Sequence, residues 1–322
     1  MDHAIRAEGL VKRFGSTTAL AGADLHAGTG TVHAVLGPNG AGKTTMVRIL
    51  TTLLRADAGH ASVAGYDVAT QPHQVRSSIA LTGQYAAVDE QLTGVENLGM
   101  VARLLGLPRA EAKRRAVTLL GEFGLDGAAG RAVRTYSGGM RRRLDLAASL
   151  VGHPDVLFLD EPTTGLDPRG RAELWEVIRS HVRGGVTVLL TTQYLEEADA
   201  LADEIVVVDH GLVVATGTPN ELKNRIGGQV LEVSPARPDD ADVVARVLAE
   251  EAGVHAEASA GTLRVPATVP GLAQTVLRRL SEDGVELAEL SLRRPSLDEV
   301  FLSLTAGAES TGDTSDTTRR SA

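Results

Sequence analysis

The sequence contains no cysteine, and none of its apolar runs is long enough to span a bilayer. The missing cysteines exclude disulfides and thiolate metal sites, and they agree with a cytosolic address. The most apolar segments, residues 156–159 and 205–208, have the length of a strand, whereas a transmembrane helix needs roughly 18 residues. We therefore expect a chain that does not cross a membrane itself.

Positive charge is also scarce, because 32 Lys and Arg stand against 41 Asp and Glu, for a net charge of −9. This balance argues against a large nucleic-acid-binding surface. The clearest basic cluster, residues 141–143, is interpreted as a solvated helix face. The nine histidines form no ligand-spaced pair, and the N-terminus lacks the cationic start and apolar core of a secretory signal.

The 322 residues are 43% hydrophobic, which is enough for one large domain and a smaller one. Residues 1–225 alternate β-rich runs with helical patterns, which predicts an α/β domain with a largely parallel sheet. Residues 85–152 interrupt the alternation and read as an inserted helical subdomain. The pattern changes near Pro235 and Pro238, so we expect a small α+β domain over residues 226–305 and a disordered tail over 306–322.

A glycine-rich segment follows the apolar run 31–36 and precedes a helical pattern at 46–50. Glycines let successive backbone N–H groups surround a phosphate, and the positive end of the following helix favours the same charge. Lys43 is then expected to reach the β and γ phosphates and Thr44 to ligate Mg²⁺. The predicted nucleotide-binding loop comprises Gly37, Pro38, Asn39, Gly40, Ala41, Gly42, Lys43, Thr44 and Thr45.

Two further segments complete a nucleotide site. The apolar run 156–159 ends in Asp160, expected to hold the Mg²⁺ hydration shell, and in Glu161, expected to polarise the water that attacks the γ phosphate. Upstream, Ser137, Gly138, Gly139 and Met140 open an amphipathic helix. A serine-capped helix start is an anion site, so it can meet a γ phosphate.

These segments, in this order, resemble the nucleotide-binding domain of ABC transporters over roughly residues 4–225. The resemblance implies a P-loop NTPase fold that binds ATP and Mg²⁺. It also implies that Ser137, Gly138, Gly139 and Met140 form the signature loop, which acts on ATP held by the opposite subunit of a head-to-tail dimer. Tyr136 and Met140 replace the commoner Leu and Gln of this loop.

Other positions are placed by the same resemblance. Phe14 matches the aromatic residue that stacks on adenine, with a core phenylalanine as the alternative. Gln84 matches the glutamine that touches Mg²⁺ and connects the catalytic core to the helical subdomain. Asp167 matches a loop that crosses the dimer interface, although next to Pro168 it can also simply cap a helix.

One position departs from the family. Where a histidine usually follows the strand 188–192, this chain has Gln193. A glutamine amide donates a hydrogen bond to the γ phosphate but exchanges no proton near neutral pH. We expect Gln193 to position the phosphate without titrating.

Gln193 and the segment 293–302 resemble the branch of daunorubicin-type antibiotic resistance ATPases of actinobacteria. The resemblance implies an ATP-hydrolysing subunit that dimerises around two Mg-ATP, sits at the cytoplasmic face of the cell membrane and drives a separate permease that exports a drug. The permease is expected to dock near Gln84, Tyr85, Val88 and Leu92. Two interpretations stay open for the apolar residues near the C-terminus: they pack on their own small domain, or they contact a partner. These residues are Leu297, Val300, Phe301 and Leu302.

Two alternatives stay open. One is a soluble ABC-type ATPase that acts on ribosomes or DNA and shares the core motifs. ATPases of this type that act on ribosomes normally have two such domains, and those that act on DNA normally have a long coiled-coil insertion. A lipid or polysaccharide cargo is the other alternative, because substrate selection lies in the membrane subunit.

Overall fold

The computed structural model describes residues 3–83, 88–225, 229–259, 261–294 and 296–301. The chain divides into two compact units, Met1–Thr218 and Pro219–Ala322. Gln84, Tyr85, Leu302 and the tail over residues 306–322 lie outside the described residues, so the expectations that concern them stay expectations.

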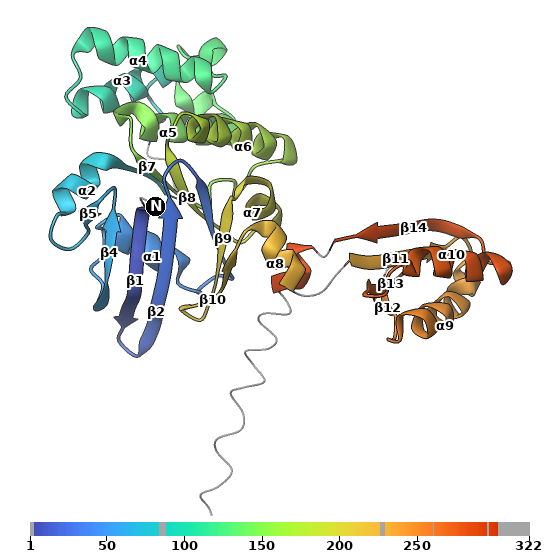
Figure 1. The fold of residues 1–322 in the computed structure, drawn as a ribbon. Coiled ribbons are helices and arrows are strands. Elements are labelled where there is room, and N and C mark those ends of the chain that lie inside the picture. The colour runs from blue at the N-terminus through green and yellow to red at the C-terminus, as the bar shows by residue number, and fades with distance from the viewer. Residues whose placement is uncertain (1–2, 84–87, 226–228, 260, 295, 302–322) are drawn as a thin grey trace, which may run out of the picture. The chain divides into compact units, whose positions relative to one another are not determined.

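A six-stranded sheet forms the centre of the first unit (Figure 1). Its strand order is β10-β9-β3-β8-β7-β6, and every neighbouring pair is parallel except β9 with β10. All residues of β3, β7 and β8 are buried, as expected for parallel strands covered on both faces. The strands are β3 (Val32–Leu36), β6 (Ile79–Thr82), β7 (Val156–Asp160), β8 (Thr187–Thr192), β9 (Glu204–Asp209) and β10 (Leu212–Gly217).

A second, antiparallel sheet lies in the same unit and was not expected from the sequence. Its order is β2-β1-β4-β5, and it consists of β1 (His3–Phe14), β2 (Thr17–Gly28), β4 (Ala58–Val63) and β5 (Tyr66–Asp67). Gly9 in β1 and Gly22 in β2 have positive φ, and the register of this pair shifts between Ala7 and Leu10. These irregularities break the apolar–polar alternation that reveals a strand in a sequence.

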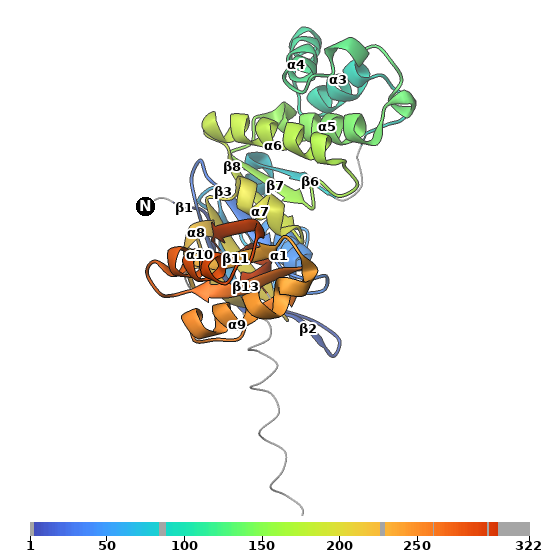
Figure 2. The same ribbon diagram turned by 90° about the vertical axis from the view of Figure 1, so that its right-hand side faces the viewer.

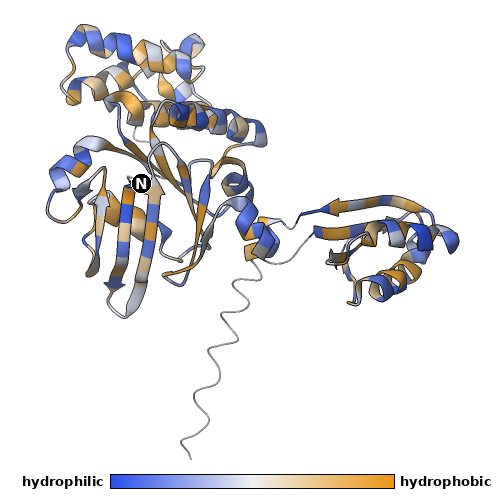
Figure 3. Cartoon of the chain, viewed as in Figure 1, coloured by the Kyte–Doolittle hydropathy of each residue, from blue (hydrophilic) through white to orange (hydrophobic). Residues whose placement is uncertain are grey.

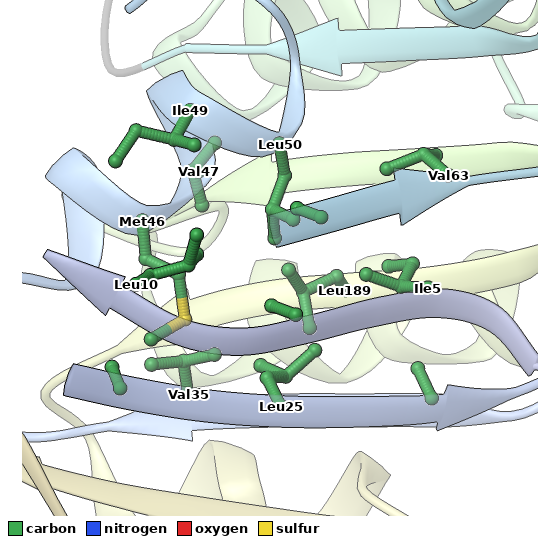
Figure 4. Close-up of a cluster of buried hydrophobic side chains, with 14 of the residues drawn as sticks. Ile5, Leu10, Leu25, Val35, Met46, Val47, Ile49, Leu50, Val63 and Leu189 are labelled. Carbon is green, nitrogen blue, oxygen red and sulfur yellow. The ribbon is translucent and has the colours of Figure 1, made fainter. Parts of the chain in front are cut away.

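The main core lies where helix α1 (Lys43–Leu50) packs between the two sheets (Figure 4). Met46 of α1 lies beside Leu10 of β1, and Leu50 of α1 and Val35 of β3 belong to the same cluster. Each such side chain contributes about 1.5–3 kcal/mol when fully buried. This packing fixes the start of α1, and with it the loop that precedes the helix.

The first unit also contains several further helices. In Figures 1 and 2, α5 and α6 lie between the sheets and the pair α3 and α4. The insertion between β6 and β7 is helical, as expected; α3 starts at Thr93, which forms a capping box with Glu96. In Figure 3, α5 and α6 alternate hydrophilic and hydrophobic residues along their length. The helices are α2 (Pro72–Ser78), α3 (Gly94–Leu104), α4 (Arg109–Glu122), α5 (Gly138–Ser149), α6 (Pro168–Arg183) and α7 (Leu195–Leu201).

The second unit is a small α+β domain, in agreement with the expected fold class. Its sheet is antiparallel with the order β12-β13-β11-β14, and α9 and α10 share one core with it. The short strand β12 was not expected. The elements are α8 (Pro219–Arg225), β11 (Gln229–Pro235), α9 (Ala241–Ala252), β12 (Glu257–Ser259), β13 (Thr262–Ala267), α10 (Leu272–Glu282) and β14 (Leu287–Arg293).

The segment after β14 packs within this second unit. Residues 297–301 are helical, and the side chains of Leu297 and Val300 are buried. Arg294 donates a hydrogen bond to Asn220 of α8 over 3.0 Å, and Arg293 pairs with Glu299 at 2.7 Å. Leu297 and Val300 therefore follow the packing interpretation of this segment.

Candidate functional site

Four parallel strands end at the same edge of the central sheet, and each leads into a predicted site segment. Leu36 of β3 pairs with Thr192 of β8, and Thr191 pairs with Asp160 of β7. On the far side of β7, Thr82 of β6 pairs with Leu159. The loops that begin at residues 37, 83, 161 and 193 therefore share one edge, where ligands of open α/β sheets bind.

The loop between β3 and α1 requires glycine at two positions. A Cβ at Gly37 would lie 2.2 Å from the carbonyl oxygen of Val208. Gly42 has φ of +109° as the N-cap of α1, and a Cβ there would lie 2.4 Å from the carbonyl oxygen of Ala19. Only glycine permits this approach, so the loop wraps tightly onto the positive end of α1 and forms an anion site.

Lys43 is the first residue of α1, and its side chain folds back over this loop. Its ammonium donates hydrogen bonds to the carbonyl oxygens of Gly37 at 2.8 Å and Pro38 at 3.0 Å, and the residue is only 5% exposed. Burial lowers the pKa of Lys43, while the carboxylates of Glu161 and Asp160 act in the opposite direction. The cation thus belongs to one electrostatic group with the two acidic residues.

Asp160 is buried at the end of β7 and receives two hydroxyl groups. Thr44 of α1 lies 3.3 Å from each carboxylate oxygen, and Thr191 of β8 donates a hydrogen bond of 2.5 Å. A hydroxyl and a carboxylate side by side next to a phosphate-binding loop are the hard oxygen ligands that Mg²⁺ prefers. Thr44 and Asp160 therefore fit this ion.

Glu161 has an unusual backbone conformation for a residue with a side chain. Its φ is +51°, a left-handed value that costs of the order of 1–3 kcal/mol unless surrounding contacts impose it. Its N–H donates to the carbonyl oxygen of Thr191 at 3.1 Å, and its half-buried carboxylate accepts a hydrogen bond from Thr164 at 3.4 Å. Such outliers gather at functional sites.

Ser137 caps α5, and its hydroxyl accepts a hydrogen bond from the N–H of Met140 at 3.2 Å. Ser137 and Gly138 are exposed, whereas the preceding Tyr136 is buried and donates to the carbonyl oxygen of Ala128 at 2.8 Å. Tyr136 thus anchors the segment, and the helix N-terminus is open to a ligand from outside. No hydrogen bond between described residues joins Ser137 to the phosphate loop.

Three further predicted residues, Phe14, Gln193 and Asp167, lie on the surface. Phe14 is 50% exposed, so the alternative of a core phenylalanine is wrong; the ammonium of Lys12 lies 5.6 Å from its ring centre. Gln193 is exposed directly after β8. Asp167 caps α6 by accepting a hydrogen bond from Gly170 at 2.7 Å, as the simpler interpretation expected.

Two residues of the site were missed from the sequence. Thr191, in the fully buried strand β8, bonds both acidic residues. Arg142 was assigned to a solvated basic cluster, and this was wrong, because the residue is only 9% exposed. The sequence signal for its burial is helical spacing: Asp145 and Leu146 lie three and four residues after Arg142, so the three side chains share one face of α5, which is buried.

Comparison with known proteins agrees with this geometry. The family model of the ABC transporter matches residues 20–164, and the model of the C-terminal domain of DrrA1-3-like ATP-binding proteins matches residues 217–305. The daunorubicin resistance ATP-binding protein DrrA2 of Streptomyces coeruleorubidus is 56% identical, covering 94% of this chain and 95% of that protein. The Nod factor export ATP-binding protein I of Ralstonia nicotianae is 41% identical, covering 92% of each.

A solved structure of an ATP-binding subunit of an ABC transporter superimposes with a TM-score of 0.62 at 28% identity, over 69% of this chain and 93% of that one. The fold and the strand-edge site define a P-loop ATPase of the ABC type. The chain belongs to the ABC transporter ATP-binding proteins, and like that family it binds and hydrolyses ATP.

Proposed function

We propose that two copies of this chain associate head to tail and enclose two Mg-ATP molecules, so that each site combines the phosphate loop of one copy with the Ser137 helix of the other. The observation that carries this proposal is the division of the site residues. Lys43, Asp160 and Glu161 meet at one strand edge, whereas Ser137 caps a separate, exposed helix. Two anion sites of this kind can hold one triphosphate between two copies.

Within this site each residue has a distinct task. The face of Phe14 stacks on adenine, the N–H groups of the phosphate loop and Lys43 bind the β and γ phosphates, and the amide of Gln193 donates to the γ phosphate. Thr44 and Asp160, together with Gln84, hold Mg²⁺, which neutralises charge on the phosphate oxygens. Glu161 accepts a hydrogen bond from the attacking water and orients it.

The partner copy completes the site. The N–H groups of Gly138, Gly139 and Met140 and the hydroxyl of Ser137 approach the γ phosphate from the other side, and Asp167 lies in the loop that crosses between copies. Hydrolysis removes the bridging γ phosphate, so the contacts that hold the copies together are lost and the dimer opens.

This opening drives a separate membrane permease, and the chain works at the cytoplasmic face of the membrane. Among the described helices, none is both long and apolar enough to cross a bilayer. Export of a drug or antibiotic is the proposed transport, because the most similar relative reported above is named for daunorubicin resistance. A lipid or polysaccharide cargo is the second candidate, since the relative from Ralstonia nicotianae is named for Nod factor export.

The substitution Glu161→Gln tests the catalytic part of this proposal. It keeps the shape of the side chain but removes the proton acceptor, so we expect turnover to fall about 100- to 10,000-fold while ATP still binds and an ATP-dependent dimer accumulates in gel filtration. The matched control Glu111→Gln alters an exposed glutamate of α4 and should change neither property. Normal turnover in Glu161→Gln would remove this residue from catalysis.

A further inference from the structure

The guanidinium group of Arg142 is surrounded by backbone carbonyl groups of the site. Helix α5 carries this side chain into the space between the loop after β7 and the end of β6. Five hydrogen bonds are formed: Nε to the carbonyl of Pro162 (2.7 Å), Nη1 to the carbonyl of Gly83 (2.6 Å) and to Asp145 (3.5 Å), and Nη2 to the carbonyls of Glu161 (3.2 Å) and Asp160 (3.4 Å).

These contacts use the full capacity of the side chain. A guanidinium has five N–H groups in one rigid plane, and no other side chain presents donors to several carbonyls in this way. Burial lowers the pKa of Arg142, while the nearby carboxylates of Asp145, Glu197 and Asp160 oppose this and stabilise the cation. Leaving such carbonyls without a donor would cost free energy, so the contacts are maintained.

The same contacts act on the strained residue of the site. Glu161 has φ of +51°, and its two peptide groups are fixed from opposite directions. Its N–H is bound by Thr191 of β8, and its carbonyl is bound by Arg142 of α5. A left-handed conformation persists only when surrounding contacts impose it, and Arg142 supplies this restraint for the peptide groups on the C-terminal side of Glu161.

We propose that Arg142 is a positioning residue for Glu161. It holds the backbone of residues 160–162 in the conformation that aims the carboxylate, and it links this segment to α5, whose first turn begins five residues earlier at Ser137. It also joins Gly83, next to Gln84, to the same group. A movement of α5 is thereby transmitted to the water-orienting carboxylate. This inference rests on the proposed role of Glu161.

The substitution Arg142→Lys tests this role, because lysine keeps the charge but cannot bind several carbonyls in one plane. We expect kcat for ATP hydrolysis to fall about 10- to 100-fold, with the KM for ATP and the affinity for ATP changed less than about twofold. The matched control is Arg115→Lys on α4. Arg115 donates to the carbonyl of Leu150 at 2.7 Å, and burial likewise lowers its pKa, but it is bonded to no site residue.

The control loses one buried hydrogen bond, so it should lower the thermal midpoint and leave kcat unchanged. An unchanged kcat in Arg142→Lys, or an equal loss of kcat in Arg115→Lys, would overturn the proposal. Arg142→Gln serves as a second variant, with the same expectations for kcat and KM.

A double variant separates this inference from the proposed function. If Arg142 acts through Glu161, then Arg142→Lys should cause no further loss of turnover in the Glu161→Gln background. If the fold-loss in turnover of the double variant equals the product of the two single losses, Arg142 acts independently of Glu161. Normal turnover of Glu161→Gln alone would instead refute the role of Glu161 itself, which is a different result from normal turnover of Arg142→Lys alone.

Discussion

Gln193 gives this site a different acid–base character from one with histidine in its place. The side chain is exposed immediately after β8, next to the threonines that bond Asp160 and cap the following turn. Its amide can donate a hydrogen bond to a phosphate oxygen, but it does not titrate near neutral pH. Any pH dependence of turnover near neutrality must then arise at other groups.

The substitution Gln193→Ala removes this donor without disturbing a buried contact. We expect kcat to fall about 10- to 100-fold, because the hydrogen bond to a charged phosphate oxygen is lost, and ATP affinity to change far less. In Gln193→His we expect recovered turnover with a new pH dependence near the ordinary pKa of histidine, about 6.5. Steady-state kinetics at several pH values measure both. Unchanged kcat in Gln193→Ala would mean that the γ phosphate is held by other groups.

The residues that the sequence predicted and those that it missed differ in a physical way. The phosphate loop is predictable because its function needs consecutive backbone groups, which appear as a continuous glycine-rich segment. Asp160 ends a buried strand, and Glu161 follows it directly. Thr191 and Arg142 are different, because their contacts depend on β8 lying beside β7 and on which face of α5 is buried. The first property is absent from any local pattern, and the second leaves only the helical spacing of Arg142, Asp145 and Leu146 as a trace.

At the scale of elements, β3 does more than support the phosphate loop, because it carries a buried histidine. The Nε2 atom of His33 accepts a hydrogen bond from the N–H of Gly28 at 3.2 Å and lies 2.9 Å from the hydroxyl of Thr31. Burial lowers the pKa of His33 to about 4, and nearby His3 acts in the same direction, which together outweigh the opposing effect of Asp203. The carboxylate of Glu204 lies 3.6 Å from Nδ1 of the ring. The ring is therefore neutral in the folded protein near pH 6.

This neutral histidine makes stability depend on pH. Because the pKa is about 4 in the folded chain and 6.5 in the unfolded one, only the unfolded chain binds the proton between these values. The contribution is present above pH 6.5 and is lost as the pH falls to 4, with about 2 kcal/mol lost by pH 5. Urea unfolding at pH 7.5 and 5 should show this loss, and His33→Gln should reduce it. Equal losses in both proteins would contradict the assignment.

At the scale of the whole molecule, the first unit contains every predicted nucleotide contact that the structure describes, and the second forms a core of its own. The helix start at Ser137 and the cap at Asp167 are exposed, and each cap side chain accepts one hydrogen bond from the first turn of its own helix. With the phosphate loop and the Ser137 helix on different copies, as proposed above, we expect catalysis to need a pair of chains.

Mixing two inactive variants measures this directly. Lys43→Ala removes phosphate binding by the phosphate loop and leaves the Ser137 helix intact. Ser137→Arg blocks the Ser137 helix and leaves the phosphate loop intact. Each variant alone should be inactive where the wild-type chain hydrolyses ATP. In a mixture, each pair with one copy of both contains one complete site, so roughly a quarter of the wild-type specific activity should return. A mixture that stays inactive, while ATP-dependent mixed pairs form, would contradict the shared site.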